Sequence, residues 1–319
     1  MARAAALASF LWKSDMRIMR LSTVINILNL RSIELIYRAS ALLLGILPNF
    51  SMAEGFVDLP INGFPDSAYT SCNATGDFGR TLSIMPTKDS NNNCAIFVPS
   101  NNIFRLPRTE GFYFKKAQVR AITMPASHAG IDPNVGTLTD MVWRNVANDQ
   151  CIYGALLHIN DVQFSNGQHW EVNDVTRGGF EGKEAAAAYY FAYHPKGIRS
   201  TESVFRIGRT HTSVRHSIGD SDLPSKNDAP APETAITYSQ KAAVSANWVN
   251  FTTDLNAKDP DGISFPDGSL MYVKTSCTAD PPAEFADAIR LRTTGQNGQE
   301  PLEIRIPGFA PSGASMNVY

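Results

Sequence analysis

From residue 54 onward, apolar and polar residues alternate over short stretches of the chain. A period of two is typical of a strand with one buried face, because successive side chains in a strand point to opposite sides. Clusters of Asp, Asn, Ser, Pro and Gly separate these stretches, as turns require. The pattern predicts strands over residues 81–85, 94–98, 111–124, 141–145, 152–164, 170–175, 203–214, 246–253, 269–275, 288–293 and 303–306.

One segment, residues 181–193, fits two kinds of element. Its run of alanines favours a helix, whereas the aromatic residues after the alanines favour a strand. We expect a short helix at the start of the segment and a strand over residues 189–193.

The predicted strands follow one another without amphipathic helices between them. This arrangement is typical of a sandwich or jelly roll and differs from the alternating strands and helices of a βαβ fold. The sequence therefore predicts a mainly all-β protein, an antiparallel β-sandwich with jelly-roll-like connections and at most one or two short helices.

A polar, proline-rich stretch at residues 219–235 interrupts the pattern of strands. It predicts a long loop inside a single domain of residues 54–319. If the stretch is instead a linker, the chain divides into residues 54–218 and 234–319. The second part would then hold only about four strands, few for an independent sandwich, so we favour the single domain.

The N-terminal segment, residues 1–53, has the features of an export signal or leader. A cation precedes the apolar run 41–47, Pro48 follows it, and small residues precede a cleavage bond after Ala53. The apolar run is far shorter than the roughly 20 residues that span a bilayer. We expect a signal peptide, and the alternative is a retained amphipathic helix on the domain or on a membrane.

All four cysteines, Cys72, Cys94, Cys151 and Cys277, follow this leader, and none belongs to a CxxC pair. An even number of cysteines in an exported chain favours disulfides. We favour Cys72–Cys94 as a local bond and Cys151–Cys277 as a long-range bond. Together with the leader, the cysteines predict a periplasmic, cell-surface or extracellular protein. The alternative is a cytosolic protein with buried free thiols.

The net charge of the whole chain is −2, but residues 1–53 carry six Lys or Arg against two Asp or Glu. The part after the leader is therefore mildly acidic. Nucleic acids require a basic surface, so no nucleic-acid partner is expected.

No familiar catalytic motif occurs in the chain. The phosphate-loop, dinucleotide, HExxH and GxSxG patterns are absent, so no catalytic residue is assigned. His158 and His169 flank a predicted turn, and a hairpin there could let Asp161 or Glu171 complete a metal site. The alternative is that both histidines are ordinary strand residues.

A cluster of oxygen-bearing side chains follows the predicted strand 246–253. Calcium binds six to eight oxygen ligands, which closely spaced Asp and Asn residues on a tight loop can supply. The alternative is an ordinary turn in which these side chains bond their own backbone. The candidate calcium ligands are Asp254, Asn256, Asp259 and Asp261.

Two tryptophans on predicted strands, Trp170 and Trp248, are candidates for a platform that stacks on sugar rings. Alternation places Trp248 on the face opposite Val249 and Phe251. If the Val and Phe face is the core, Trp248 lies nearer solvent than the other tryptophans. The alternative is that both aromatic side chains belong to the core, where large aromatic residues on strands are usually found.

Three functions remain open from the sequence. An exported structural or surface-associated binding protein of unknown ligand, with a cell-surface or glycan partner as its expected target, fits the leader, the cysteines and the lack of catalytic motifs. The first alternative is a carbohydrate-binding or carbohydrate-active β-sandwich protein, since glycosidases need only two carboxylates that no motif exposes. The second is a metal-dependent exported enzyme.

Overall fold

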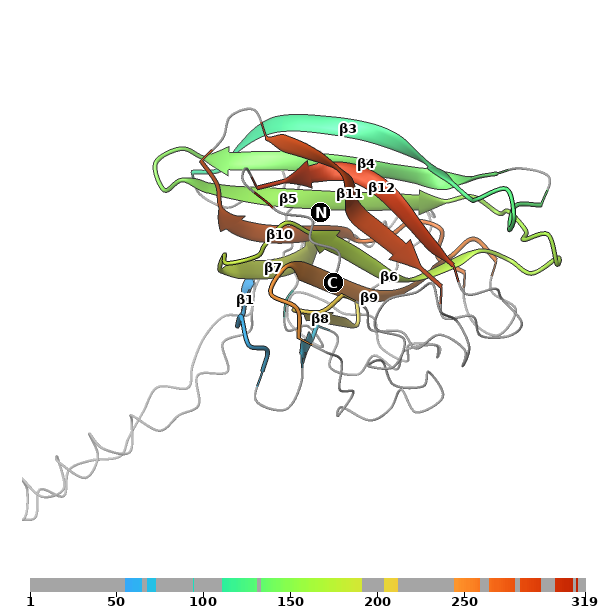
Figure 1. Ribbon diagram of the computed structural model, residues 1–319, viewed down its shortest axis with the longest axis horizontal. Helices are drawn as coiled ribbons and strands as arrows, with labels where there is room; N and C mark the ends of the chain where they lie inside the picture. The colour runs from blue at the N-terminus through green and yellow to red at the C-terminus, as the bar shows by residue number, and fades with distance from the viewer. Residues whose placement is uncertain are drawn as a thin grey trace, which may run out of the picture. The chain divides into compact units, whose positions relative to one another are not determined.

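The computed structural model describes residues 55–64, 68–72, 94, 111–130, 133–190, 204–211, 244–258, 264–278, 282–293, 302–311 and 314. These residues contain no helix, and their strands form two six-stranded antiparallel sheets (Figure 1). The prediction of an all-β sandwich is confirmed. Met52–Tyr319 forms one compact unit.

The first sheet has the strand order β1-β7-β10-β5-β4-β3. Every neighbouring pair in it is antiparallel. Its strands are β1 (Val57–Leu59), β7 (Ala185–Tyr190), β10 (Leu270–Ser276), β5 (Gln150–Ile159), β4 (Asn134–Asn145) and β3 (Tyr113–Thr123).

The second sheet has the order β12-β11-β6-β9-β8-β2, again with antiparallel neighbours. Its strands are β12 (Glu303–Ala310), β11 (Ala283–Arg292), β6 (Glu171–Gly178), β9 (Trp248–Asn256), β8 (Arg206–Gly208) and β2 (Tyr69–Ser71). Strands from the last third of the chain thus lie between earlier strands in both sheets. The strands after residue 244 have no sheet of their own.

The core lies between the two sheets, where alternate residues of each strand point inward. Ala187 and Tyr189 of β7 share this buried cluster with Val249 and Phe251 of β9. Burying one large apolar side chain stabilises a fold by roughly 1.5–3 kcal/mol, so a cluster of many such side chains stabilises the packing of the two sheets.

Most predicted strands overlap observed ones, but several bounds differ. β4 begins at Asn134, well before the predicted start at residue 141, because Gly136 and several threonines weaken the apolar alternation there. β5 ends at Ile159, and Phe164 makes only an isolated bridge to Ala129. The short strands β1 and β2 were not predicted, since three residues carry too little periodicity. Predicted strand 81–85 lies outside the described residues.

The prediction of a short helix at the start of segment 181–193 is wrong. The alanines form strand β7, which lies between β1 and β10 in the first sheet. Hydrogen bonding on both sides of the strand and burial of its small side chains override the intrinsic helix preference of alanine. The end of the predicted strand, residues 191–193, lies outside the described residues.

Both predicted disulfides are present. Cys72 pairs with Cys94 at a Cα–Cα distance of 5.0 Å, and Cys151 pairs with Cys277 at 5.6 Å. The second bond joins β5 to the residue that directly follows its neighbour β10. The first connects the sheets, because the Cys72 N–H donates to Phe205 beside β8, whereas the Cys94 carbonyl accepts from Tyr189 of β7. Two disulfides indicate an oxidising environment.

A buried ion pair also joins the two sheets. Arg177 of β6 donates from Nη2 to Oδ1 of Asp140 in β4 at 2.7 Å, and from Nη1 to the carbonyl of Phe309 in β12. The Phe309 N–H donates to the other Asp140 oxygen at 2.6 Å. Burial raises the pKa of the Asp140 carboxyl, while the Arg177 charge acts in the opposite direction. Because both carboxyl oxygens accept hydrogen bonds, the contacts favour the ionised form.

Candidate functional site

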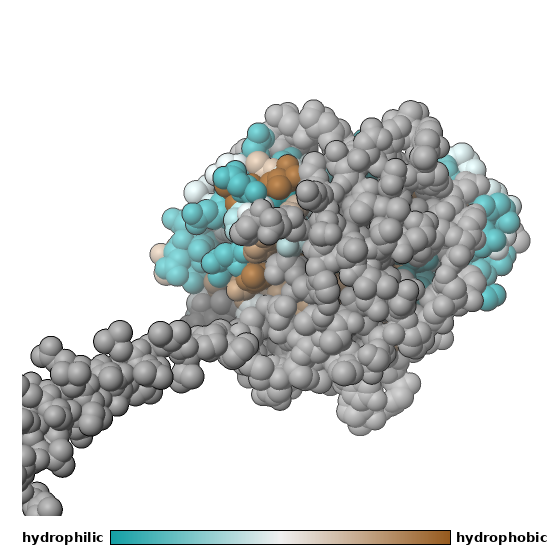
Figure 2. Space-filling view, turned by 90° about the horizontal axis from the view of Figure 1, so that it is seen from below, coloured by the Kyte–Doolittle hydropathy of each residue, from teal (hydrophilic) through white to brown (hydrophobic). Residues whose placement is uncertain are grey.

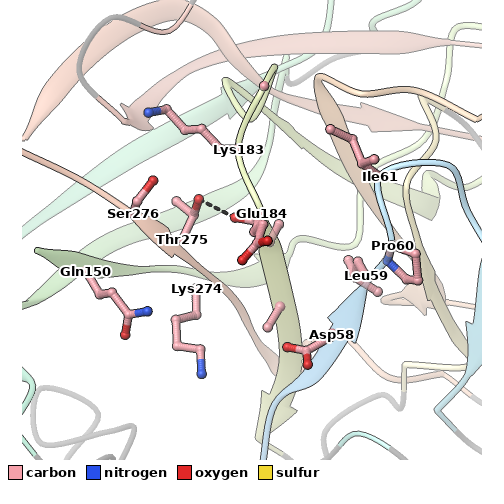
Figure 3. A pocket seen from close by; sticks show the side chains of 13 residues that line it. Asp58, Leu59, Pro60, Ile61, Gln150, Lys183, Glu184, Lys274, Thr275 and Ser276 are labelled. Carbon is pink, nitrogen blue, oxygen red and sulfur yellow. Dashed lines mark hydrogen bonds between the residues drawn. The ribbon is translucent and has the colours of Figure 1, made fainter. Parts of the chain in front are cut away.

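A groove opens at the β1 end of the first sheet (Figure 3). Its volume is about 750 Å³, within the range of small-molecule binding sites. We call it the edge groove. Its lining consists of Asp58, Leu59, Pro60, Ile61, Gln150, Gly182, Lys183, Glu184, Ala185, Ala186, Lys274, Thr275 and Ser276.

The strand register explains why a groove forms there. Ala186 of β7 lies between Asp58 of β1 and Lys274 of β10 in one cross-strand row. Neighbouring strands are about 4.8 Å apart, which places the backbones of Asp58 and Lys274 about 10 Å apart. Ala186, which is buried, contributes only a methyl group between these two longer side chains.

Four charged side chains line the edge groove, two acidic and two basic. Asp58, Glu184, Lys183 and Lys274 form no ion pair with one another or with any other described residue. The Lys274 ammonium lies 4.8 Å from the ring centroid of Phe56, a cation–π contact. These charges are therefore available to a ligand.

Backbone contacts fix the end of the edge groove. The Thr275 hydroxyl donates to the carbonyl of Glu184 at 2.6 Å, as Figure 3 shows. The Lys183 carbonyl accepts a hydrogen bond from Arg209, and the Lys183 N–H donates to Phe180 at 3.0 Å. The turn that carries Lys183 and Glu184 is thus attached both to β10 and to the neighbouring buried residues.

The coloured part of the surface in the space-filling view contains both hydrophilic and hydrophobic residues. Hydrophilic residues lie beside smaller hydrophobic areas in Figure 2. In the part of the chain that the structure describes, no helix has the length and hydrophobicity to cross a bilayer.

A second cluster of polar residues lies on the face of the second sheet that points away from the core. We call it the polar face. Asn250 donates from Nδ2 to Asp174 and to Thr176, each at 2.8 Å. One row holds Thr252, Asp174, Arg292 and Glu303, and the next holds Asn250, Thr176, Arg290 and Arg305.

His211 packs against the polar face. Arg290 Nη1 lies 2.9 Å from His211 Nε2, and Arg292 Nη2 lies 2.8 Å from His211 Nδ1. The Arg290 guanidinium also stacks 4.3 Å from the ring centroid of Trp248, and the His211 and Trp248 rings meet edge-on. Arg292 forms an ion pair with Glu303. These side chains therefore form one connected network.

The polar face holds its charges inside the protein. Asp174, Asn250, Arg290 and Arg292 are buried. Burial tends to raise the pKa of the Glu303 carboxyl, but the charges of Arg292 and Arg290 outweigh burial and leave that pKa below its usual value. Glu303 therefore stays ionised near neutral pH and holds no proton to donate. The arrangement suits a structural network better than acid–base catalysis.

The structure corrects the expectation that Trp248 lies near solvent. Alternation does place Trp248 and Asn250 on the face opposite Val249 and Phe251, but Trp248 is only 2% exposed. Trp170 is 1% exposed and packs edge-on against Phe164. Arg290 and His211 pack against Trp248, and Trp170 belongs to the core, so neither ring is free to stack on a sugar.

The candidate calcium residues are only partly described. Asp254 is half-buried and Asn256 is buried in β9, with Asn256 Nδ2 donating to the Asp254 carbonyl at 3.3 Å. Asp259 and Asp261 lie outside the described residues. The described residues include no group of three or more His, Cys, Asp or Glu side chains that could hold a metal ion. The calcium site remains a prediction.

The two histidines near the predicted turn have different neighbours. His158 Nδ1 lies 2.6 Å from Asp267 Oδ1, whereas His169 Nδ1 lies 3.0 Å from Asp161 Oδ1. Gln163 lies 3.2 Å from the other His169 nitrogen. Each imidazole is therefore held by its own carboxylate, and no described third ligand brings the two together.

Sequence reasoning missed both clusters. The edge groove depends on Asp58 and Lys274, which are far apart in the chain and adjoin only through the register of β7. The polar face left a weak signal in the alternating arginines of β11, Arg290 and Arg292, which a strand pattern places on one face.

No family model matches the chain, and neither the curated proteins nor the solved structures include one that is significantly similar to it.

Proposed function

We propose that this chain is an exported, disulfide-stabilised binding protein associated with the cell surface, and that the edge groove is its binding site. The observation that carries the proposal is an open groove with four charged side chains that no described residue pairs. Charged groups left exposed in a concave site favour ligand binding, because a ligand can supply the missing partners.

Export is supported by the two disulfides. Their cysteines, Cys72, Cys94, Cys151 and Cys277, are buried in the core, and disulfides persist in oxidising compartments. The pattern at residues 1–53 lies outside the described residues and supplies the proposed signal. The proposed compartment is the periplasm, the cell surface or the medium.

N-terminal sequencing of the full chain expressed in its own host tests export. We expect a mature protein that begins at Glu54 and gives no reaction with a thiol reagent after unfolding. An intact Met1 together with four reactive thiols would contradict export and the disulfides at once.

Surface association is tested by fractionating host cells that express variants of the edge groove. We expect the wild type in the envelope fraction and the Lys183→Glu/Lys274→Glu variant in the medium, because the reversed charges repel the ligand. Lys258→Glu serves as the control, since Lys258 is exposed and lies outside the groove. Equal distribution of all three proteins would refute a binding role for the groove.

A carbohydrate ligand remains the second proposal, supported by the amide of Gln150 and the hydroxyl of Ser276 in the groove. Both groups can hydrogen-bond sugar hydroxyls. The residues that the sequence offered for stacking are buried, so a sugar would have to bind through these polar groups. Binding of a neutral oligosaccharide that is lost in Gln150→Ala would favour this form.

A further inference from the structure

We infer that the edge groove binds an extended peptide segment that carries both acidic and basic side chains. This inference rests on the proposed function and adds the chemical class of the ligand. Three features of the groove support it: the order of charges across the strands, the polar groups of the lining and the volume.

The charges in the edge groove alternate in sign across the sheet. Asp58 stands on β1, the edge strand, and Lys274 stands two strands away on β10, with Ala186 between them. Figure 3 shows both among the side chains that line the groove. Their backbones are about 10 Å apart, so a ligand between them meets a carboxylate on one side and an ammonium on the other.

The turn that precedes β7 repeats this pairing of signs. Lys183 and Glu184 follow Gly182 there, next to Ser276 of β10. A ligand with one kind of charge would satisfy two of the four side chains and be repelled by the other two. A ligand with both signs can pair with all of them, and charge-assisted contacts are about twice as strong as neutral ones.

The polar lining of the groove suits a polypeptide backbone. Ala185 belongs to the core and Ala186 is only 3% exposed, so neither places a large side chain in the groove. Gln150 and Ser276 lie at one side and offer an amide and a hydroxyl, which can donate to or accept from peptide groups. Pro60 and Ile61 form an apolar wall on the other side.

The volume of the edge groove agrees with a short peptide segment as its ligand. A cavity of about 750 Å³ is too large for a single amino acid and falls in the range that holds drug-sized ligands of several residues. An extended hexapeptide spans about 20 Å, which covers the width of the strands that line the groove.

Four capped hexapeptides of equal length test the inference by isothermal titration with the mature protein. One alternates Lys and Glu, one contains only Glu, one only Lys, and one only Ser and Gly. We expect the alternating peptide to bind at least tenfold more tightly than each of the others. Lys274→Met should weaken this binding about tenfold, as the loss of one charge-assisted contact implies. Lys258→Met is the matched control and should leave it unchanged.

A charge exchange separates electrostatics from damage to the fold. Lys274→Asp alone should abolish binding of the alternating peptide, and the Asp58→Lys/Lys274→Asp double variant should restore it, because the peptide can bind in the reverse direction. Both residues lie at least partly at the surface, and unchanged melting temperatures would verify folding.

Three results would overturn the inference. The first is equal binding of all four peptides, and the second is a double variant that binds no better than Lys274→Asp. The third is binding of a neutral oligosaccharide, lost in Lys274→Met, without peptide binding. That third result would overturn the peptide ligand but leave the groove as a binding site. If the groove variants instead remain in the envelope fraction like the wild type, the proposed function itself is refuted.

Discussion

At the scale of single residues, one buried ion pair, Asp140 with Arg177, connects the two sheets of this sandwich. Asp140 and Arg177 bond each other from different sheets, and Phe309 bonds both of them. Desolvation makes an isolated buried charge costly, so each partner is tolerated only with the other in place. The pair therefore fixes how the sheets align more than it adds net stability.

Replacing Asp140 by alanine should lower the free energy of unfolding by about 3–5 kcal/mol, because it leaves the Arg177 guanidinium buried without its carboxylate. Urea denaturation of both proteins measures the difference. The Asp140→Leu/Arg177→Met double variant should lose less than the single variant, since no charge remains buried. A single variant within 1 kcal/mol of wild type would contradict the assigned role.

The ion pairs of Glu303 on the polar face make the stability of the fold depend on pH. Arginine charges hold the pKa of Glu303 below its unfolded value, so its ionised form stabilises the fold above the unfolded pKa. This contribution is lost as the pH falls through the lower, folded pKa. Glu303→Gln should therefore flatten the fall in melting temperature between about pH 5 and pH 2. Identical pH profiles for the two proteins would exclude the effect.

At the scale of elements, the long edge strand β3 shows how the sheet avoids pairing with other molecules. β3 pairs only with β4 among the described strands and exposes Tyr113 and Val119. Lys115 and Lys116 stand on it next to a break in register. Lysines and bulges on an edge discourage the addition of further strands.

Removing these lysines should make the protein self-associate. The Lys115→Val/Lys116→Val variant presents a longer apolar edge, so sedimentation velocity should show dimers or larger species at concentrations where the wild type is monomeric. Lys258→Val removes a lysine elsewhere and should not change the sedimentation. A variant that stays as monomeric as the control would show that the edge is protected by other means.

The elements also show what local sequence can predict. Strands with clean alternation, such as β9 and β10, were predicted within a few residues. β7 was partly misassigned because its alanines are held in a strand by β1 and β10, which are distant in sequence. Intrinsic preference is weak compared with hydrogen bonding on both sides, so such a segment is decided by its neighbours.

At the scale of the whole molecule, the two disulfides hold different parts of the architecture. Cys151–Cys277 closes a loop across 126 residues, and Cys72–Cys94 closes one across 22. Chain entropy predicts roughly 5 kcal/mol and 3 kcal/mol of stabilisation, respectively. Replacing Cys151 and Cys277 by alanine should therefore lower the denaturation midpoint more than replacing the other pair. The opposite order would show that strain or residual structure outweighs loop length.

The sequence could predict how the four cysteines pair, but it could not predict the edge groove. Cysteine pairing followed from two separations along one chain, whereas the edge groove required the register of three strands. Asp58, Ala186 and Lys274 share a row only because β1 and β10 both pair with β7. Without that register, Asp58 and Lys274 are ordinary surface residues. The sequence therefore favours Trp170 and Trp248 as ligand-binding residues instead.

The interleaved strand order has a consequence for the time at which the protein can fold. β10 is a central strand of the first sheet, and β11 lies between β6 and β12 in the second. A chain that emerges from the ribosome N-terminus first cannot complete the first sheet before Ser276 or the second before Ala310 has been synthesised. Non-local strand pairing is also slow. The topology therefore delays completion of both sheets until late in synthesis, and a chain without completed sheets can still be threaded through a narrow pore.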